Sequence, residues 1–229
     1  MFNDLKKDLE NLKDLDKAKL LSGFFKTGKG QYGEGDIFLG IKVPDQRKLA
    51  KKYSDLNLKD VQKLLESKIH EERLVALLIL IIKYKKSENK KEIFDFYLKN
   101  TKNINNWDLV DLSAPNIVGD YLTDKNRKIL YDLAKSNHLW EKRIAIVSTA
   151  SFIRKNDFKD TIKISEMLID DKHDLIHKAV GWMLREVGKR NQDTLENFLK
   201  IQYKKMPRTM LRYSIEKFDE EKRQSYLKL

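Results

Sequence analysis

Apolar residues recur at helical spacing through most of the chain, in two alternating kinds of segment. Amphipathic segments, apolar on one side, surround Leu64, Ile93, Ile129 and Ile162. Longer and more apolar segments lie between them, at residues 71–86, 105–122, 139–155 and 174–190. An amphipathic helix is typical of a surface position, and a helix that is apolar all round is typical of a buried one. The pattern predicts helix pairs, each with a half-exposed and a more buried member.

The buried segments repeat with a fixed period. Four residues spaced 35 positions apart each open such a segment: Arg73, Asp108, Arg143 and Lys178. The positions that follow them align as a shared core face: Leu74, Leu109, Ile144 and Ala179, then Leu77, Leu112, Val147 and Trp182. Helix pairs of about this length are typical of HEAT- and TPR-like solenoids. We predict an all-α, HEAT-like repeat solenoid of antiparallel helix pairs, whose inner helices line a concave basic groove.

The two ends depart from this period, as capping repeats do. Residues 1–26 predict a helix or a helical pair, and a glycine-rich loop follows at residues 26–36. Pro44 then stands in a favourable first-turn position of a further helix. We expect a single domain over residues 1–229, in which residues 1–55 form N-terminal capping helices around the glycine-rich loop.

The second repeat differs from its siblings in charge and in backbone. It carries Asp108 where the others have a basic residue. It carries Asp111 where the others have an uncharged residue, namely Ala76, Ile146 and Gly181. Pro115 is expected to kink or divide this inner helix, because its ring removes a backbone donor and clashes with the preceding turn.

A carboxylate at a normally uncharged inner-helix position loses hydration, so it requires a compensating partner or a function. Two explanations stay open: a functional carboxylate, which favours Asp111, and a local Asp–Arg pair or helix cap, which suits Asp108. Because the two residues are three apart, they share roughly one helix face, and a pair of carboxylates acting together is a further alternative.

The three tryptophans differ in their repeat context. Trp107 replaces the polar residues found at this position in the other repeats, which favours a contact role over packing. Trp182 is in phase with apolar core residues, so ordinary burial and a contact role are both open. Trp140 is expected to be a packing residue.

The charge of the chain points to a polyanionic partner. The formal net charge is +12 and the isoelectric point is about 9.5, and lysine and arginine release condensed counterions when they neutralise phosphates. Residues 1–100 and the remainder each carry +6, so no basic tail accounts for the charge. A basic stripe on the third and fourth inner helices, including Arg143, Lys178 and Arg185, suits phosphate contacts. A generally lysine-rich composition is the alternative explanation.

Several classes of site are not predicted. The chain has no cysteine, which excludes disulfides and thiolate metal sites. The glycines of residues 28–35 lack the spacing of a phosphate-binding loop, and His173 with His177 has no third metal ligand in view. The charged N-terminal segment has no apolar signal core, and no long apolar run occurs. We expect a soluble cytoplasmic monomer with no cofactor, no metal and no membrane partner.

In the segments NNWDLVD, LWEKR and HKAVGWMLRE, and in FLGIKVPDQR near the start, the chain resembles the AlkD-like DNA alkylation repair family of DNA glycosylases. The resemblance implies a single-domain HEAT-like solenoid that binds duplex DNA and releases cationic N3- and N7-alkylpurines. It implies Asp111 as the catalytic carboxylate, flanked by Trp107 and Trp182. It also implies that Arg143 and Arg185 face DNA phosphates. The longer glycine-rich loop departs from the family pattern, so the resemblance does not extend to the N-terminal DNA contacts.

The chemistry implied by the resemblance agrees with the residues present. An alkylated purine is cationic and leaves as a neutral base, so one carboxylate suffices to stabilise the developing oxocarbenium-like sugar and to position water. Without a Schiff-base lysine in the motif, base removal without strand cleavage is expected. Two rival functions remain: a non-catalytic repeat protein that binds damaged or branched DNA, and a scaffold for an acidic protein partner.

Overall fold

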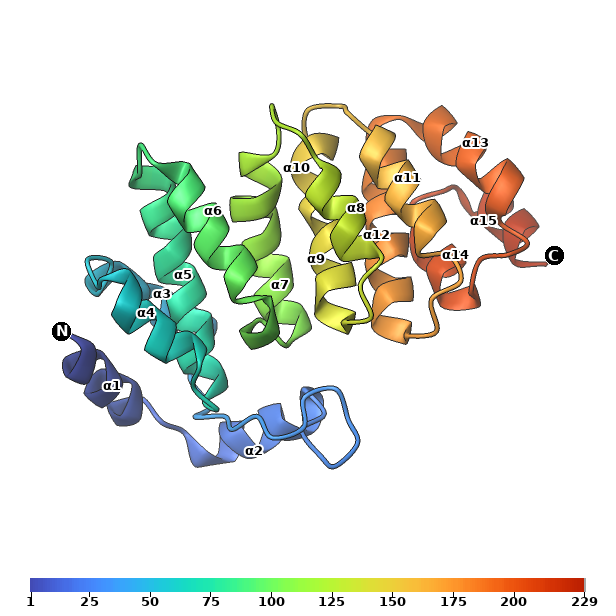
Figure 1. Ribbon diagram of the computed structural model, residues 1–229. Helices are drawn as coiled ribbons and strands as arrows, with labels where there is room; N and C mark the ends of the chain where they lie inside the picture. The colour runs from blue at the N-terminus through green and yellow to red at the C-terminus, as the bar shows by residue number, and fades with distance from the viewer. Residues whose placement is uncertain (229) are drawn as a thin grey trace. The chain divides into compact units, whose positions relative to one another are not determined.

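The computed structural model describes residues 1–228, and within them the chain is helical throughout, apart from an isolated parallel bridge between Ile37 and Ile69 (Figure 1). The predicted all-α class is confirmed. Contacts within the chain group it into two compact units, Met1–Leu109 and Val110–Leu229, and each is described by itself. None of the helices in residues 1–228 has the length and apolar character needed to cross a membrane.

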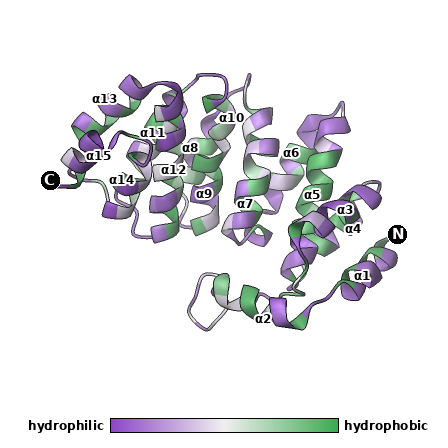
Figure 2. Ribbon diagram, turned by 180° about the vertical axis from the view of Figure 1, so that it is seen from behind, coloured by the Kyte–Doolittle hydropathy of each residue, from purple (hydrophilic) through white to green (hydrophobic). Residues whose placement is uncertain are grey.

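Unit 1 is built around one long buried helix. Its elements are α1 (Phe2–Asn11), α2 (Leu15–Phe24), α3 (Val43–Lys52), α4 (Leu58–Leu65), α5 (His70–Lys86), α6 (Lys90–Lys99) and a 3-10 turn (Thr101–Asn103). Helices α3, α4 and α6 pack against α5. Most of α5 is buried and apolar, and it is green over much of its length in Figure 2. Pro44 lies in the first turn of α3, as predicted.

The polar residues in the first turn of α5 are also buried, and each has a partner. The Glu71 carboxylate accepts three backbone N–H groups from the segment that precedes α3: those of Leu39, Gly40 and Ile41, at 2.8–3.3 Å. Gly40 has a positive φ of 85°, and a Cβ there would lie 2.1 Å from the Asp14 carbonyl oxygen. Asp14, the residue before α2, is therefore in close contact with the Gly40 backbone, whose N–H donates to Glu71, and a side chain at position 40 would not fit.

Unit 2 is centred on α12. Helix α7 (Trp107–Ala114) begins in unit 1 and continues into unit 2, and the further elements are a π-helical turn (Pro115–Gly119), α8 (Lys128–Ala134), α9 (Leu139–Ser148), α10 (Ala150–Ile153), α11 (Lys159–Met167), α12 (Asp174–Arg190), α13 (Gln192–Gln202), α14 (Arg208–Ser214) and α15 (Glu220–Leu227). Helices α9, α11, α13 and α14 all pack against α12.

The 35-residue register corresponds to real helices. Each of its four opening residues lies in the first turn or so of an inner helix, respectively α5, α7, α9 and α12. The first predicted core row is buried, with Leu74, Leu109, Ile144 and Ala179 at most 3% exposed. The second row is only partly buried, because the side chains of Leu112 and Trp182 keep some exposure to solvent.

Two further predictions about the inner helices are confirmed. Regular α-helix in α7 stops at Ala114, and Pro115 opens the π-helical turn, so the proline does divide the helix. Trp140 is 5% exposed and packs in the core.

Candidate active site

Trp107 is the first residue of α7 and is half-buried in an aromatic cluster of unit 1. Its ring stacks on Phe25, with 5.2 Å between ring centroids, and meets the edge of Phe24 at 5.9 Å. Phe25 also stacks on Phe38 at 5.0 Å. Offset and edge contacts of this kind stabilise aromatic pairs beyond the area that they bury. The cluster packs Trp107 against the last residue of α2 and the residue that follows it.

Asp108 is bonded to a buried histidine. The His70 Nε2 atom lies 2.8 Å from Asp108 Oδ2, and its Nδ1 atom lies 3.5 Å from Asp36 Oδ2. The imidazole is 2% exposed, stacks on Phe38 with 4.5 Å between ring centroids and contacts Phe25 at 5.1 Å. Phe25 contacts the rings of both His70 and Trp107, so the histidine is linked to Trp107 through this phenylalanine and through Asp108, the next residue of α7.

Asp36 links His70 to Arg73, the first of the four residues spaced 35 positions apart. Its carboxylate accepts a hydrogen bond of 2.6 Å from Arg73 Nη2 and one of 3.3 Å from Asn105 Nδ2. Burial would raise the pKa of the Asp36 carboxyl, but the hydrogen bond with His70 and the charge of Arg73 outweigh it, and the pKa lies below its ordinary value. Burial would likewise lower the pKa of His70, but its bonds to Asp108 and Asp36 hold the pKa above the ordinary value.

Asp111 lies in unit 2, where it forms a two-pronged ion pair with Arg143 of α9. Arg143 Nε donates to Asp111 Oδ1 and Nη2 donates to Oδ2, both at 2.8 Å. The third guanidinium nitrogen, Nη1, donates to the Leu175 carbonyl oxygen at 2.6 Å. The Arg143 side chain is 6% exposed, whereas that of Asp111 is 20% exposed. The arginine therefore holds a carboxylate in a fixed plane while part of it stays accessible to solvent.

The structure identifies the partner of each aspartate, and a catalytic role for Asp111 stays a prediction. The Asp–Arg pair expected for Asp108 is found instead at Asp111, and Asp108 pairs with His70. At the register position of Asp111, Ala76 and Ile146 are both fully buried. The guanidinium is therefore the compensation that allows a carboxylate at this position. The predicted contact of Arg143 with a phosphate stays a prediction.

Trp182 lies on α12, which packs against α9, the helix that carries Arg143. Its side chain is half-buried, unlike the buried Leu77 and Val147 of the same register row. The neighbouring Gly181 lies against α14, where an added Cβ would be 2.5 Å from the Met210 carbonyl oxygen. The space at Gly181 is therefore occupied by α14.

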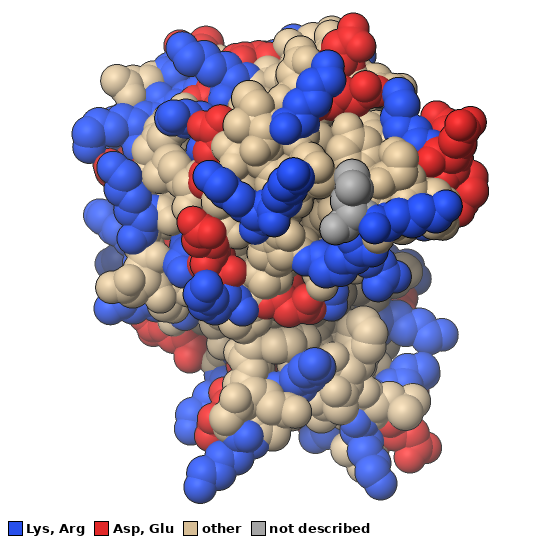
Figure 3. Space-filling view, turned by 90° about the vertical axis from the view of Figure 1, so that its right-hand side faces the viewer, with Lys and Arg blue, Asp and Glu red and all other residues tan. Residues whose placement is uncertain are grey.

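Arg185, two turns beyond Lys178 on α12, is paired at the surface. Its guanidinium forms an ion pair with Glu216 and approaches Glu186 at 3.6 Å, and its side chain is 18% exposed. Lys178 is paired with Asp174 at 2.7 Å. On the face of the molecule drawn in Figure 3, lysine and arginine side chains are spread among acidic ones. The positive charge seen there is distributed, in agreement with the lack of a basic tail.

Sequence reasoning missed His70, Asp36 and Arg73 as members of one cluster. A sequence signal existed, since three charged or polar residues, His70, Glu71 and Glu72, open the most apolar segment of the chain. Such residues at the start of a buried helix require partners. The identity of the partners was hidden, because Asp36 is the last residue of the glycine-rich loop and is 34 residues away from His70.

The fold and the site define a class of protein: a helical-repeat chain with a clamped, partly exposed carboxylate and two half-buried tryptophans. A family model described as "DNA alkylation repair enzyme" matches residues 5–218, so the chain belongs to this family. A solved structure described as a predicted DNA alkylation repair enzyme from Enterococcus faecalis is 17% identical, with a TM-score of 0.71. The match covers 91% of this chain and 97% of that one, and shows the likeness of fold. No curated protein matches the chain.

Proposed function

We propose that this family member is a DNA glycosylase that hydrolyses the N-glycosidic bond of N3- and N7-alkylated purines in duplex DNA. The observation that carries the proposal is the Asp111–Arg143 pair, in which a guanidinium orients a carboxylate that keeps access to solvent. A carboxylate fixed before the reaction stabilises developing positive charge without reorganising during it.

The proposed reaction needs one such group. An alkylated purine carries a positive charge, so breaking its bond to C1′ of the deoxyribose releases a neutral base without a general acid. A water oxygen then bonds to C1′, and its proton passes to Asp111 or to solvent, leaving an abasic site. Asp111 stabilises the oxocarbenium-like sugar and orients this water, as carboxylates do in glycoside hydrolysis. Arg143 acts as a positioning residue for the carboxylate.

The two tryptophans are assigned to the cationic nucleotide. Each ring face attracts a cation with about 0.5–2 kcal/mol, depending on how well water is excluded. Trp107 is suited to this role because Phe25 and Phe24 hold its ring while it stays half-buried. Trp182 is likewise half-buried in unit 2. Truncating Trp107 to alanine should slow excision more than it weakens binding to undamaged duplex.

DNA binding is assigned to the basic character of the chain, with Arg185 as a phosphate contact. The net charge of +12 favours a polyanion, and affinity for duplex DNA should fall steeply as salt increases. Because no Schiff-base lysine is proposed, the product should be an intact strand with an abasic site. The strand should break only after treatment with hot alkali.

The deciding experiment measures the release of free base from a duplex that carries one N7-methylguanine. We expect Asp111→Asn to lower the single-turnover rate by about 100-fold or more, as for the loss of a preorganised electrostatic group. Asp132→Asn, which breaks an exposed ion pair with Lys128 on α8, is the matched control and should retain the rate. Absence of base release by the parent protein, or equal rates for the parent and Asp111→Asn, would refute the proposal.

A further inference from the structure

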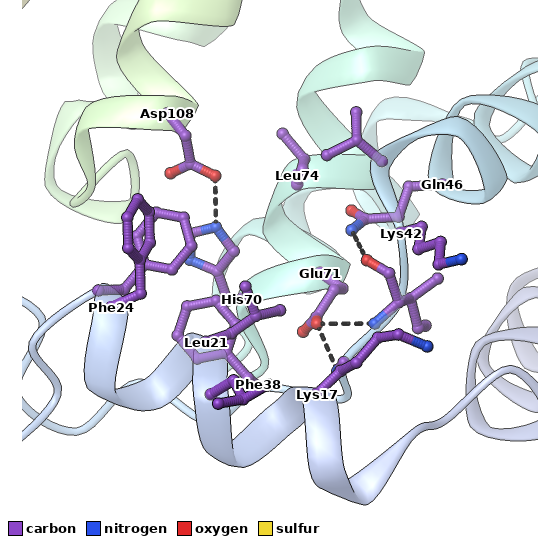
Figure 4. Close-up of a pocket in the computed structure, with 15 residues that line it drawn as sticks. Lys17, Leu21, Phe24, Phe38, Lys42, Gln46, His70, Glu71, Leu74 and Asp108 are labelled. Atoms are coloured by element: carbon purple, nitrogen blue, oxygen red, sulfur yellow. Dashed lines mark hydrogen bonds and ion pairs between the residues drawn. The ribbon is translucent and has the colours of Figure 1, made fainter.

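A cavity in unit 1 has the size and lining of a small-molecule site. Its volume is about 320 Å³, within the range of ligand pockets. It lies between α2, the segment before α3 and the first turn of α5 (Figure 4). Most of its lining is apolar, and the side chains that matter below are Leu21, Phe25, Val43 and Leu74.

Helix α2 covers this cavity without being packed into the core. None of its side chains is buried, and Leu20 and Phe24, which line the cavity, are 72% and 63% exposed. The apolar face of α2 therefore has much surface that a bound apolar molecule would remove from water. This gives a favourable contribution roughly proportional to the area covered.

A buried hydrogen-bond acceptor in the wall of the cavity lacks a partner. Gln46 is 2% exposed, and its Nε2 donates to the Ile41 carbonyl oxygen at 2.8 Å. Its Oε1 has no hydrogen-bond partner within the described residues, and Figure 4 shows this oxygen on the side facing Leu74. A buried acceptor without a partner carries a cost of desolvation, which a donor on a ligand would remove.

The charges at the cavity favour an anionic group at its edge. Lys17 and Lys42 line the cavity, and Figure 4 shows both amino groups on the same side of it. The acidic residues that line it are already engaged, Glu71 by three backbone N–H groups and Asp108 by His70. Lys17 also pairs with Asp14, so Lys42, which is exposed, is the stronger candidate for an incoming anion.

We infer that this cavity binds a small aromatic anion that carries one N–H or O–H donor. The aromatic body lies against the side chains of α2 and Phe25, the donor bonds to Gln46 Oε1, and the anionic group lies beside Lys42. Asp111 is not among the residues that line the cavity, and binding there does not depend on the proposed excision activity.

Two dyes that differ in a single group test this inference on the full chain. N-phenyl-1-naphthylamine offers two aromatic groups and one N–H donor, and 1-anilinonaphthalene-8-sulfonate adds an anion. Calorimetry should give one site per chain for both dyes. Lys42→Gln should weaken the sulfonate about two- to fivefold, the effect of one exposed ion pair, and leave the neutral dye unchanged. Lys48→Gln, a neighbouring lysine outside the cavity, should change neither.

The acceptor and the cavity are tested with the neutral dye. Gln46→Met should weaken the dye about fivefold, as for one hydrogen bond, but should not affect the N-methylated dye, which has no donor. Leu21→Trp should abolish binding by filling the cavity, and Leu15→Trp, at an exposed position of the same helix, should not. Val43→Trp repeats the test from the opposite wall if Leu21→Trp does not unfold cooperatively.

Three results would overturn the inference. Undiminished binding to both cavity-filling variants places the dyes elsewhere on the protein. Equal loss of the N–H and N-methylated dyes in Gln46→Met removes the assigned hydrogen bond. Equal loss of the charged and neutral dyes in Lys42→Gln removes the assigned ion pair. None of these results bears on base release, so failure here is distinguishable from failure of the proposed glycosylase.

Discussion

Asp108 and Asp111 lie three residues apart on α7, yet different bases hold their carboxylates. Asp108 is bonded to His70, which stacks on Phe38 and contacts Phe25 in unit 1. Asp111 meets Arg143, which is anchored to a backbone carbonyl in unit 2. A guanidinium stays protonated at every pH at which proteins fold, whereas an imidazole titrates near neutrality. The first pair can therefore respond to pH, and the second gives a constant geometry.

Exposure does not separate the two aspartates, since the Asp108 side chain is 19% exposed and that of Asp111 is 20% exposed. The way each carboxylate is held does separate them. One ring nitrogen of His70 bonds to Asp108, whereas two guanidinium nitrogens of Arg143 bond to the two oxygens of Asp111. A carboxylate that acts on a substrate needs both fixed orientation and access. The proposed chemistry is assigned to Asp111 because its orientation is the more firmly fixed of the two.

The largest effect is expected from breaking the arginine pair. Arg143→Leu removes the partner of Asp111 and the donor to the Leu175 carbonyl. It should lower the free energy of unfolding by about 3 kcal/mol, the lower end for a broken buried pair, because Asp111 keeps some access to water. Arg143→Lys keeps the charge and loses the two-pronged geometry, so it should cost less. Urea denaturation measures both, and a parent-like value for Arg143→Leu contradicts the assigned role.

A smaller effect is expected from the histidine pair. His70→Gln replaces charge-assisted hydrogen bonds to Asp108 and Asp36 by weaker ones and removes the ring that packs against Phe38 and Phe25. We expect a loss of about 2 kcal/mol in the free energy of unfolding. His173→Gln is the matched control, since the His173 ring accepts a neutral backbone hydrogen bond from Leu175. It should cost less than His70→Gln.

The pH dependence of these two losses gives a sharper comparison. Because the folded-state pKa of His70 is raised, its contribution is fully present below the unfolded-state pKa and is lost as pH rises through the folded value. The groups that face it are Asp36 and Asp108, with Arg73 beside Asp36. The cost of His70→Gln should therefore be greatest near pH 6 and shrink toward pH 9.

The cost of Arg143→Leu should stay constant over the same range, because the guanidinium does not titrate there. Unfolding in urea at several pH values, with each variant measured beside the parent, separates the two cases. A pH-independent cost for His70→Gln would mean that the ring contributes through packing and neutral hydrogen bonds alone.

The sequence contained the helices and the unusual positions but left their partners open. Register and helical periodicity were enough to predict the inner helices, the break at Pro115 and the core position of Trp140. These features follow from local spacing and from one-dimensional repetition, which a single sequence displays directly. Asp111 was visible because the other repeats provide a comparison for each of its positions.

The pairings could not be predicted in the same way. Asp111 and Arg143 are 32 residues apart, and His70 and Asp108 are 38 apart. Which basic residue pairs with which carboxylate depends on how neighbouring helices pack. The sequence indicated an Asp–Arg pair at Asp108, and the structure has it at Asp111. The cavity beside α2 was also hidden, because it depends on a helix that leaves its apolar face uncovered.

The smallest change in stability is expected at Arg185, the second arginine assigned to DNA. Its ion pair with Glu216 lies at the surface, so Arg185→Gln should lower the free energy of unfolding by about 0.5 kcal/mol. If Arg185 contacts a phosphate, the same variant should weaken duplex binding and lower the slope of log affinity against log salt by about one. Lys163→Gln on α11 breaks a comparable surface pair with Glu166 and is the matched control. Fluorescence anisotropy at several salt concentrations measures both variants, and identical slopes would remove Arg185 from the proposed DNA contacts.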